Sequence, residues 1–265
     1  MKIEGLKIGI IGAGNLGKAM AQGLLDGGYP AESLTLTRRN TTALEEFSEL
    51  GISVHSDNKK CVEESDVVIL AVKPYNVLTI LDEISENINP KKHMIVSVVT
   101  GVGLNPLSET LPKGTPLFRA MPNTAADVKE SLTCICQIHA GPQQTDAIQS
   151  IFVALGRVVF IQEELMDAAT VMGACGIAYV MRFIRAMVQG GIEIGFDSKT
   201  ATTIVMQTVK GAAELLIERG THPESEIDKV TTPKGCTIAG LNEMEHYGFS
   251  SSLIKGIRTS YERID

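Results

Sequence analysis

The sequence lacks any excess of positive charge. Its 265 residues include 24 lysines and arginines against 31 aspartates and glutamates, which gives a formal net charge of −7. Nucleic-acid binding depends on a broad positive field, because contacts with phosphates dominate that interaction. We therefore expect no nucleic-acid partner. An anionic ligand would have to be met locally, by a helix N-terminus or by a few well-placed basic side chains.

Long apolar runs and a secretory leader are also missing. The longest charge-free helical stretch, residues 168–181, has 14 residues, whereas a membrane-spanning helix needs roughly 20. The first five residues, Met1 to Gly5, show no basic region followed by an apolar one, as a signal peptide would. We expect no membrane segment and a cytoplasmic protein.

Cysteine is scarce and odd in number. The five are Cys61, Cys134, Cys136, Cys175 and Cys236. Most lie in apolar runs, which is typical of small buried side chains in a reducing compartment. No further cysteine or histidine stands at ligand spacing, so we expect no metal site.

Short β-branched runs alternate with helical patterns through the first 160 residues or so. Continuous apolar runs such as residues 67–72 suit strands that are buried on both faces of a parallel sheet. The alternation predicts an α/β fold, with a Rossmann-type doubly wound parallel sheet. The expected strands are residues 7–11, 34–37, 67–72, 94–99, 116–121, 133–138 and 157–161, and the expected helices are residues 16–25, 42–50, 77–84 and 146–155.

After Ile161 no strand pattern returns, which predicts an all-α C-terminal domain. We place the domains at residues 1–161 and 162–265. The expected helices are residues 163–190, 197–219, 224–230, 235–246 and 251–262. Residues 168–179 have almost no polar face, and a helix of that kind is buried. Because a domain of about 100 residues has little interior, we expect a homodimer or higher oligomer through these helices.

A glycine-rich segment opens the chain. Gly12-Ala13-Gly14-Asn15-Leu16-Gly17 has the form G-x-G-x-x-G between an expected strand and an expected helix, which is the context of a dinucleotide-binding turn. Gly12 would allow the tight turn, Gly14 the approach of the pyrophosphate, and Gly17 the packing of helix on strand. The N–H groups at the helix start, including those of Asn15 and Leu16, would bind the phosphates.

The choice of dinucleotide depends on the end of the second expected strand. Arg38, Arg39 and Asn40 follow it, where an NAD site usually carries an acidic residue for the ribose 2′-hydroxyl. Guanidinium groups bind phosphates with paired donors. This segment therefore predicts NADP as the cofactor, with NADPH preferred over NADH.

Two further strand ends should reach the same crevice. The third expected strand ends in Ala71-Val72-Lys73-Pro74, and Asn123 follows the fifth. Ligands bind at the carboxyl ends of the strands in open α/β sheets. We therefore expect these residues beside the cofactor.

Taken in order, several segments resemble pyrroline-5-carboxylate reductase, and the resemblance covers essentially the whole chain. Besides the glycine-rich segment and Ala71–Pro74, they are residues 121–124, 173–179 and 230–241. The resemblance implies reduction of the C=N bond of 1-pyrroline-5-carboxylate to L-proline, the last step of proline biosynthesis. NADPH, less often NADH, is the reductant.

The resemblance further implies that the loop Thr232–Thr237 holds the substrate carboxylate, through Thr232, Thr237 and the backbone at Gly235. Its place before an expected helix suits an anion. The sequence departs from the family pattern at three positions: Lys234 replaces the first glycine of a Gly-Gly pair, Ile177 a proline, and Arg185 a common acidic residue.

Two alternatives are a related two-domain NADP-dependent reductase of another imine or a β-hydroxy acid, and a non-enzymatic NADPH-binding oligomer. Hydroxy-acid enzymes of this type need a lysine on the first long interdomain helix, and residues 166–180 contain none. A non-enzymatic protein would have no use for the threonine-rich loop. Imine reduction depends mainly on positioning, and none of the five histidines is a clear acid.

Overall fold

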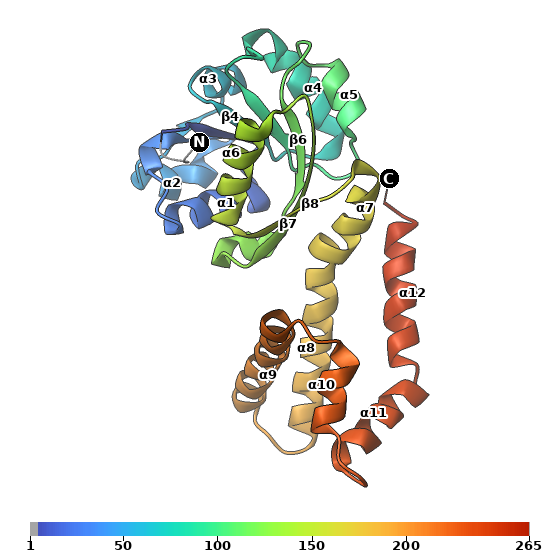
Figure 1. Cartoon of the computed structure of the whole chain (residues 1–265). Coiled ribbons are helices and arrows are strands. Elements are labelled where there is room, and N and C mark those ends of the chain that lie inside the picture. The colour runs from blue at the N-terminus through green and yellow to red at the C-terminus, as the bar shows by residue number, and fades with distance from the viewer. Residues whose placement is uncertain (1–4, 265) are drawn as a thin grey trace. The chain divides into compact units, whose positions relative to one another are not determined.

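The computed structural model describes residues 5–264, so most of the N-terminal segment in which we expect no signal peptide lies outside the described residues. The chain divides into two compact units (Figure 1). The first ends at Ala174 and also includes Ile264, and the second runs from Cys175 to Arg263.

An eight-stranded sheet forms the centre of the first unit, in the order β3-β2-β1-β4-β5-β6-β7-β8. Its strands are β1 (Ile8–Ile11), β2 (Leu34–Thr37), β3 (Ser53–His55), β4 (Val67–Leu70), β5 (Met94–Ser97), β6 (Leu117–Met121), β7 (Ser131–Ile138) and β8 (Gly156–Phe160). The first six run parallel in the order 3-2-1-4-5-6, which is that of doubly wound dinucleotide-binding sheets. The predicted fold class is confirmed.

Helices cover both faces of this sheet, because alternate residues of each central strand point to opposite sides. Ile8 and Ile10 face a core shared with α1 (Asn15–Asp26) and α6 (Pro142–Val153). Ile11 and Val68 face a second core, under α3 (Asn58–Glu63), α4 (Pro74–Ile84) and α5 (Leu104–Glu109). Figure 1 shows the two helical layers on either side of the sheet.

The sheet differs from the expectation in two respects. Strand β3 and helices α3 and α5 were not predicted, because three to six residues are too few to show a clear hydrophobic period. Strands β6 and β7 pair antiparallel. The connection between them contains only the short helical turn η4 (Thr124–Val128), and a parallel pairing would need a crossover of about a dozen residues.

The helical run after β8 starts within the first unit. It consists of the turn η5 (Glu163–Leu165), α7 (Met166–Ala169) and a wider π-helical turn, η6 (Thr170–Cys175). Met166 is fully buried in the second core of the sheet domain. The first compact unit therefore continues to Ala174, and the limits 1–161 and 162–265 stay a prediction about the domains.

The second unit consists of five helices. These are α8 (Gly176–Glu193), α9 (Ser198–Arg219), α10 (Pro223–Val230), α11 (Cys236–His246) and α12 (Phe249–Tyr261). The last four lie close to their predicted positions, whereas α8 forms only the later part of the helix predicted over residues 163–190. Asp197 caps α9 by accepting hydrogen bonds from the N–H groups of Lys199 and Thr200. Within the described range, the second unit has one cluster of buried apolar residues, which consists of Val188, Ala201 and Val205 between α8 and α9.

One helical run is long and apolar enough to cross a membrane by length and composition alone. It spans Glu163–Glu193, with a mean hydropathy of 1.5 in its most apolar window. The charge-free stretch of residues 168–181 ends at Arg182 and is therefore shorter than this helical run. The expectation that no helix is long enough to span a membrane was wrong for this reason. Only 11% of that window is buried within the chain. Most of this apolar window is therefore at least partly exposed in the described chain.

His93 is a buried histidine just before β5, with 3% of its surface exposed. Its Nδ1 accepts a hydrogen bond from the N–H of Asn89, and its Nε2 has no partner among the described residues. Burial, followed by the charge of Lys92, lowers the pKa of His93, and Asp66 offsets this in part. The imidazole is therefore neutral in the folded protein at neutral pH.

We predict that the free energy of unfolding falls as the pH drops below about 6.5, the ordinary pKa of histidine in an unfolded chain. Below that pH the unfolded chain binds a proton that the folded chain does not yet bind, so the stabilisation is complete above it and lost as the pH falls toward the lowered folded value. Urea unfolding between about pH 5 and 8 would measure this change. The free energy of unfolding of His93→Gln should fall less at acid pH than that of the wild type. In the control His246→Gln, which replaces an exposed histidine, it should fall as much as in the wild type. Superimposable pH profiles for wild type and His93→Gln would contradict the prediction.

Candidate functional site

The turn after β1 requires glycine at position 12. Gly12 has a φ of +89°, and an added Cβ would lie 2.4 Å from Cγ1 of Val72 and 2.9 Å from the carbonyl oxygen of Ala71. The N–H groups of Gly12 and Ala13 both donate to the carbonyl oxygen of Thr37, at 3.1 and 2.8 Å. The turn is therefore held between the ends of β2 and β4.

Helix α1 begins directly behind this turn and presents unused donors. Gly14 is its N-cap residue, and a Cβ there would meet only the carbonyl oxygen of Gly12, at 3.9 Å. Within this described helix no side chain caps the first turn, and none in it is acidic. The N–H groups of Asn15, Leu16 and Gly17 have no acceptor one turn earlier in the helix, and the positive end of the helix dipole lies there. The open side at Gly14 therefore fits a pyrophosphate.

Tight packing explains the third glycine. A Cβ on Gly17 would lie 3.3 Å from Cγ2 of Ile10 and 3.4 Å from the carbonyl oxygen of Gly12. The helix thus rests closely on β1 and on the turn. Gly12 thus has its predicted place in the tight turn and Gly17 its predicted place in the packing of α1 on β1, and the contact of Gly14 with a pyrophosphate stays a prediction.

Basic side chains lie at the end of β2. The guanidinium of Arg38 donates through Nη1 to the carbonyl oxygen of Ala13 at 3.5 Å, so it reaches the glycine-rich turn. Arg38, Arg39 and Asn40 are exposed, and the Asn40 side chain accepts from the N–H of Thr42. Within residues 5–264 neither arginine forms an ion pair. Both charges are available to an anion, as a 2′-phosphate requires.

Thr37 and Asn58 belong to the same edge and were not predicted. The Thr37 hydroxyl donates to Oδ1 of Asn58 at 2.7 Å, and Nδ2 of Asn58 donates to Glu83 at 3.4 Å. Asn58 begins α3, directly after its N-cap residue Asp57. Because β3 and α3 are too short to show a hydrophobic period, no sequence pattern indicated that Asn58 lies beside β2.

The end of β4 lies against the glycine-rich turn, as expected. The N–H of Ala71 donates to the carbonyl oxygen of Ile11 at 2.8 Å, and Val72 packs next to Gly12. Lys73 is the N-cap residue of α4 and Pro74 its first residue, both exposed. These four residues are therefore close to the turn, and their contact with a cofactor stays a prediction.

Asn123 is used mainly by the protein itself. It is buried at the end of β6, where its N–H donates to Oγ of Ser131 and its Oδ1 accepts from the N–H of Ala125, both at 3.0 Å. Its Nδ2 donates to the carbonyl oxygen of Gly173 at 3.2 Å. One Nδ2 proton is left for another acceptor. The structure thus gives Asn123 a bracing role, and its predicted cofactor contact stays a prediction.

The threonine-rich loop in the second unit forms a tight turn in front of α11. The N–H of Gly235 donates to the carbonyl oxygen of Thr232 at 2.9 Å, with Pro233 and Lys234 between them. A Cβ on Gly235 would lie 2.6 Å from Oγ1 of Thr232, so glycine is required. Within the described α11 no side chain caps the first turn and none in it is acidic. With Thr232 and Thr237 exposed, the loop offers hydroxyl and backbone donors to an anion.

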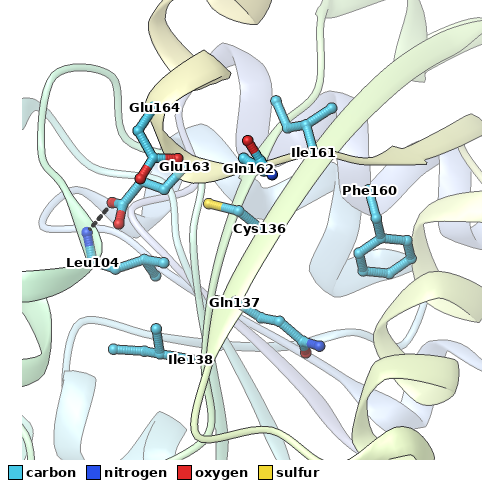
Figure 2. A pocket seen from close by; sticks show the side chains of 9 residues that line it. All are labelled: Leu104, Cys136, Gln137, Ile138, Phe160, Ile161, Gln162, Glu163 and Glu164. Carbon is cyan, nitrogen blue, oxygen red and sulfur yellow. Dashed lines mark hydrogen bonds between the residues drawn. The ribbon is translucent and has the colours of Figure 1, made fainter.

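A separate cavity of about 550 Å³ in the first unit lies beside β7 and β8 (Figure 2). None of the predicted cofactor residues lines it. At its edge, Oε1 of Glu163 accepts from the N–H of Leu104 and pairs with Nη1 of Arg119 at 3.3 Å, and Nη2 of Arg119 lies 3.6 Å from Asp167. These contacts tie the start of the helical run to β6. The donors that suit a phosphate are at the glycine-rich turn and do not line this cavity.

Two family models match the chain. The model described as "Pyrroline-5-carboxylate reductase dimerisation" matches residues 163–265, and that described as "NADP oxidoreductase coenzyme F420-dependent" matches residues 7–101. Their limits cover the threonine-rich loop and the glycine-rich turn, respectively.

Curated relatives extend the similarity over the whole chain. Pyrroline-5-carboxylate reductase 2 of Dictyostelium discoideum is 39% identical over 97% of this chain and 91% of its own length. The enzyme of Methanosarcina acetivorans is 37% identical over 98% of this chain and 97% of its own length. Pyrroline-5-carboxylate reductase 1 of Dictyostelium discoideum is 41% identical over 99% of this chain, which spans 50% of that relative.

Solved structures agree with the sequence relatives. A pyrroline carboxylate reductase of Plasmodium falciparum, with NADP bound, superposes with a TM-score of 0.88 at 25% identity, over 98% of this chain and 97% of that one. A pyrroline-5-carboxylate reductase of Coxiella burnetii gives 0.89 at 26% identity, with the same coverage of both chains.

The position of Arg38 generates a prediction on cofactor binding. Arg38→Ala should weaken NADPH binding by about 1.5–3 kcal/mol, the scale of one hydrogen bond to a charged group, and should leave NADH binding nearly unchanged. Fluorescence titration of both dinucleotides measures this. The control is Lys113→Ala, which removes an exposed cation in the loop before β6, at the opposite ends of the strands. Equal losses for NADPH and NADH would show that Arg38 acts on the turn and not on the 2′-phosphate.

Proposed function

The chain belongs to the pyrroline-5-carboxylate reductase family, and we propose on that basis how its residues carry out the reaction. Its function is the reduction of 1-pyrroline-5-carboxylate in proline biosynthesis. The observation that carries this conclusion is 39% identity to a curated family member over 97% of this chain. Membership also sets aside the hydroxy-acid reductase and the non-enzymatic oligomer as alternatives.

The protein's part in the reaction is positioning. A dinucleotide held at the glycine-rich turn would supply the hydride that the carbon of the C=N bond accepts; with a proton on the nitrogen, the product is a secondary amine. A protonated imine is already electrophilic, so orientation supplies most of the acceleration, on the order of 7–11 kcal/mol when the geometry is good. The residues that matter are therefore those that hold the two reactants.

NADPH as the preferred donor is part of the proposal. Three observations support it: the guanidiniums of Arg38 and Arg39, which form no ion pair within residues 5–264, the absence of an acidic residue among Arg38–Thr42, and the NADP-binding region that the chain shares with its family. A carboxylate at the end of β2 would repel a 2′-phosphate. We assign Gly12, Gly14 and the start of α1 to the pyrophosphate.

The threonine-rich loop is proposed to hold the substrate carboxylate. Thr232 and Thr237 supply hydroxyl donors, and the start of α11 at Gly235 supplies backbone N–H groups. Charge-assisted hydrogen bonds of this kind are stronger than neutral ones. The carboxylate then fixes the orientation of the ring that carries the C=N bond.

Thr237→Ala tests the carboxylate assignment, because it keeps the backbone and deletes one donor. The loss of a hydrogen bond to a charged group costs roughly 1.5–3 kcal/mol, so kcat/KM for 1-pyrroline-5-carboxylate should fall about 10- to 150-fold. NADPH affinity should hardly change.

Two controls accompany this measurement. Thr203→Ala, on α9, removes a hydroxyl that donates to the carbonyl oxygen of Lys199 within the same helix, and it should have little effect on turnover. A cyclic imine without a carboxylate should be a poor substrate of the wild type and insensitive to Thr237→Ala. An equal drop in the turnover of both imines would remove the carboxylate role from Thr237.

The dimerisation match to residues 163–265 supports a homo-oligomer. The helices of the second unit leave large apolar side chains exposed, among them Met181 at 62% and Met206 at 57%. A groove of about 540 Å³ between α8 and α12 is lined mainly by apolar side chains, including Phe183, Phe249 and Leu253. Exposed apolar surface of this kind is typical of an interface. We propose that a second copy of the chain covers this apolar surface and contributes residues to each active site. We also propose that the protein is cytoplasmic, because the apolar helices are then buried between the two copies and not in a membrane.

Light scattering at micromolar concentration should therefore give a mass of at least twice the 28.4 kDa of one chain. Phe183→Asp places a charge in the apolar groove and should shift the protein toward monomer with a loss of activity. Lys210→Ala changes an exposed residue on α9 and should leave the mass unchanged. A fully active species of 28.4 kDa would refute the dimer.

A further inference from the structure

Lys234 adopts a backbone conformation that lysine seldom takes. Within residues 5–264, three non-glycine residues have a positive φ, and Lys234, at +61°, is the one among them in the second unit. It is the third residue of the turn in which the N–H of Gly235 donates to the carbonyl oxygen of Thr232. A turn with proline second and a positive φ third normally carries glycine or asparagine there. Strained residues of this kind often mark functional sites.

The charges around Lys234 make it the available cation of this loop. Residues 229–242 contain two lysines and no acidic residue. Lys229 is paired with Glu226 at 2.6 Å, whereas Lys234 is exposed and forms no ion pair within the described part of the chain. Lys234 thus lies in the turn that precedes α11, between Thr232 and Thr237 in the sequence.

We propose that Lys234 is an affinity-determining residue for imine substrates that carry a carboxylate. This inference rests on the proposed function of the Thr232–Thr237 loop. Backbone N–H groups and the threonine hydroxyls give short, directional hydrogen bonds to the carboxylate. Lys234 adds electrostatic attraction at longer range. Salt screens this attraction, whereas it has much less effect on the short hydrogen bonds. In a chain with a net charge of −7, this cation raises the local potential where an anionic substrate must enter.

Three substitutions separate charge from backbone conformation. Lys234→Asn removes the charge with a side chain that tolerates positive φ, Lys234→Gly removes both the charge and the strain, and Lys234→Arg keeps the charge. The KM for 1-pyrroline-5-carboxylate should rise about two- to fivefold in the asparagine and glycine variants, the scale of an exposed ion pair. The kcat, the KM for NADPH and the turnover of a cyclic imine without a carboxylate should stay at their wild-type values. Lys234→Arg should resemble the wild type.

Salt dependence gives a readout that a purely structural role would not change. The wild-type KM for 1-pyrroline-5-carboxylate at saturating NADPH should rise between about 0.02 and 0.5 M NaCl, as screening shortens the range of the lysine charge. The Lys234→Asn and Lys234→Gly variants should show a flatter dependence. An unchanged KM with an unchanged salt slope in both variants would overturn the proposal.

The failure of this proposal can be told apart from the failure of the loop assignment. If Thr237→Ala affects only the carboxylated imine while Lys234→Asn is silent, the loop binds the carboxylate and Lys234 has no part in it. If Thr237→Ala affects both imines equally, the loop assignment fails, and the proposal for Lys234 fails with it. Loss of folding in Lys234→Asn would be visible in its melting temperature, and Lys234→Gly, which relieves the strained φ, then decides the outcome.

Discussion

The close approach of Gly12 to the end of β4 is the constraint on which the nucleotide half of the molecule depends. No side chain fits between this residue, the backbone of Ala71 and the side chain of Val72, and the same turn is tied to Thr37 at the end of β2. Two strand ends and a helix start are thereby brought to one point. Arg38, the donors of α1 and the end of β4 become neighbours because the turn leaves them no other arrangement.

The helical half depends on a constraint of a different kind. Within the described chain its helices bury only a small apolar cluster, around Val188, Ala201 and Val205. Most of their large apolar side chains remain exposed, so the free energy that holds them in place must come largely from contact with another surface. A region that folds stably only when paired would couple assembly to the loop that we assign to the substrate.

The main helices and strands could be predicted from the sequence because they are long or continuously apolar. Strands such as β4 and the helices from α9 to α12 were placed within a few residues. The short β3 and α3 escaped, and with them Asn58, because a period cannot be read from three to six residues. The antiparallel pairing of β6 with β7 follows from the short connection between them. The pattern of apolar residues within the strands does not show this direction.

The same distinction between local patterns and long-range contacts applies to the residues of the candidate site. The glycines of the turn were identified by a motif, and the structure supplies a steric reason for glycine at Gly12 and Gly17. The bracing contacts of Asn123 depend on Gly173, 50 residues away, which no local pattern contains. Long-range partners of this kind are set by packing and not by spacing.

An acidic chain that must hold two anions has to create positive potential without a positive surface. The starts of α1 and α11 do this by leaving their first turns without a carboxylate or a capping side chain, whereas α3 and α9 are capped by Asp57 and Asp197. A capping carboxylate satisfies the same N–H groups that a bound anion would use. The net charge of −7 disfavours an anion elsewhere on the surface, so anion binding depends on donors at helix starts that carry no capping carboxylate.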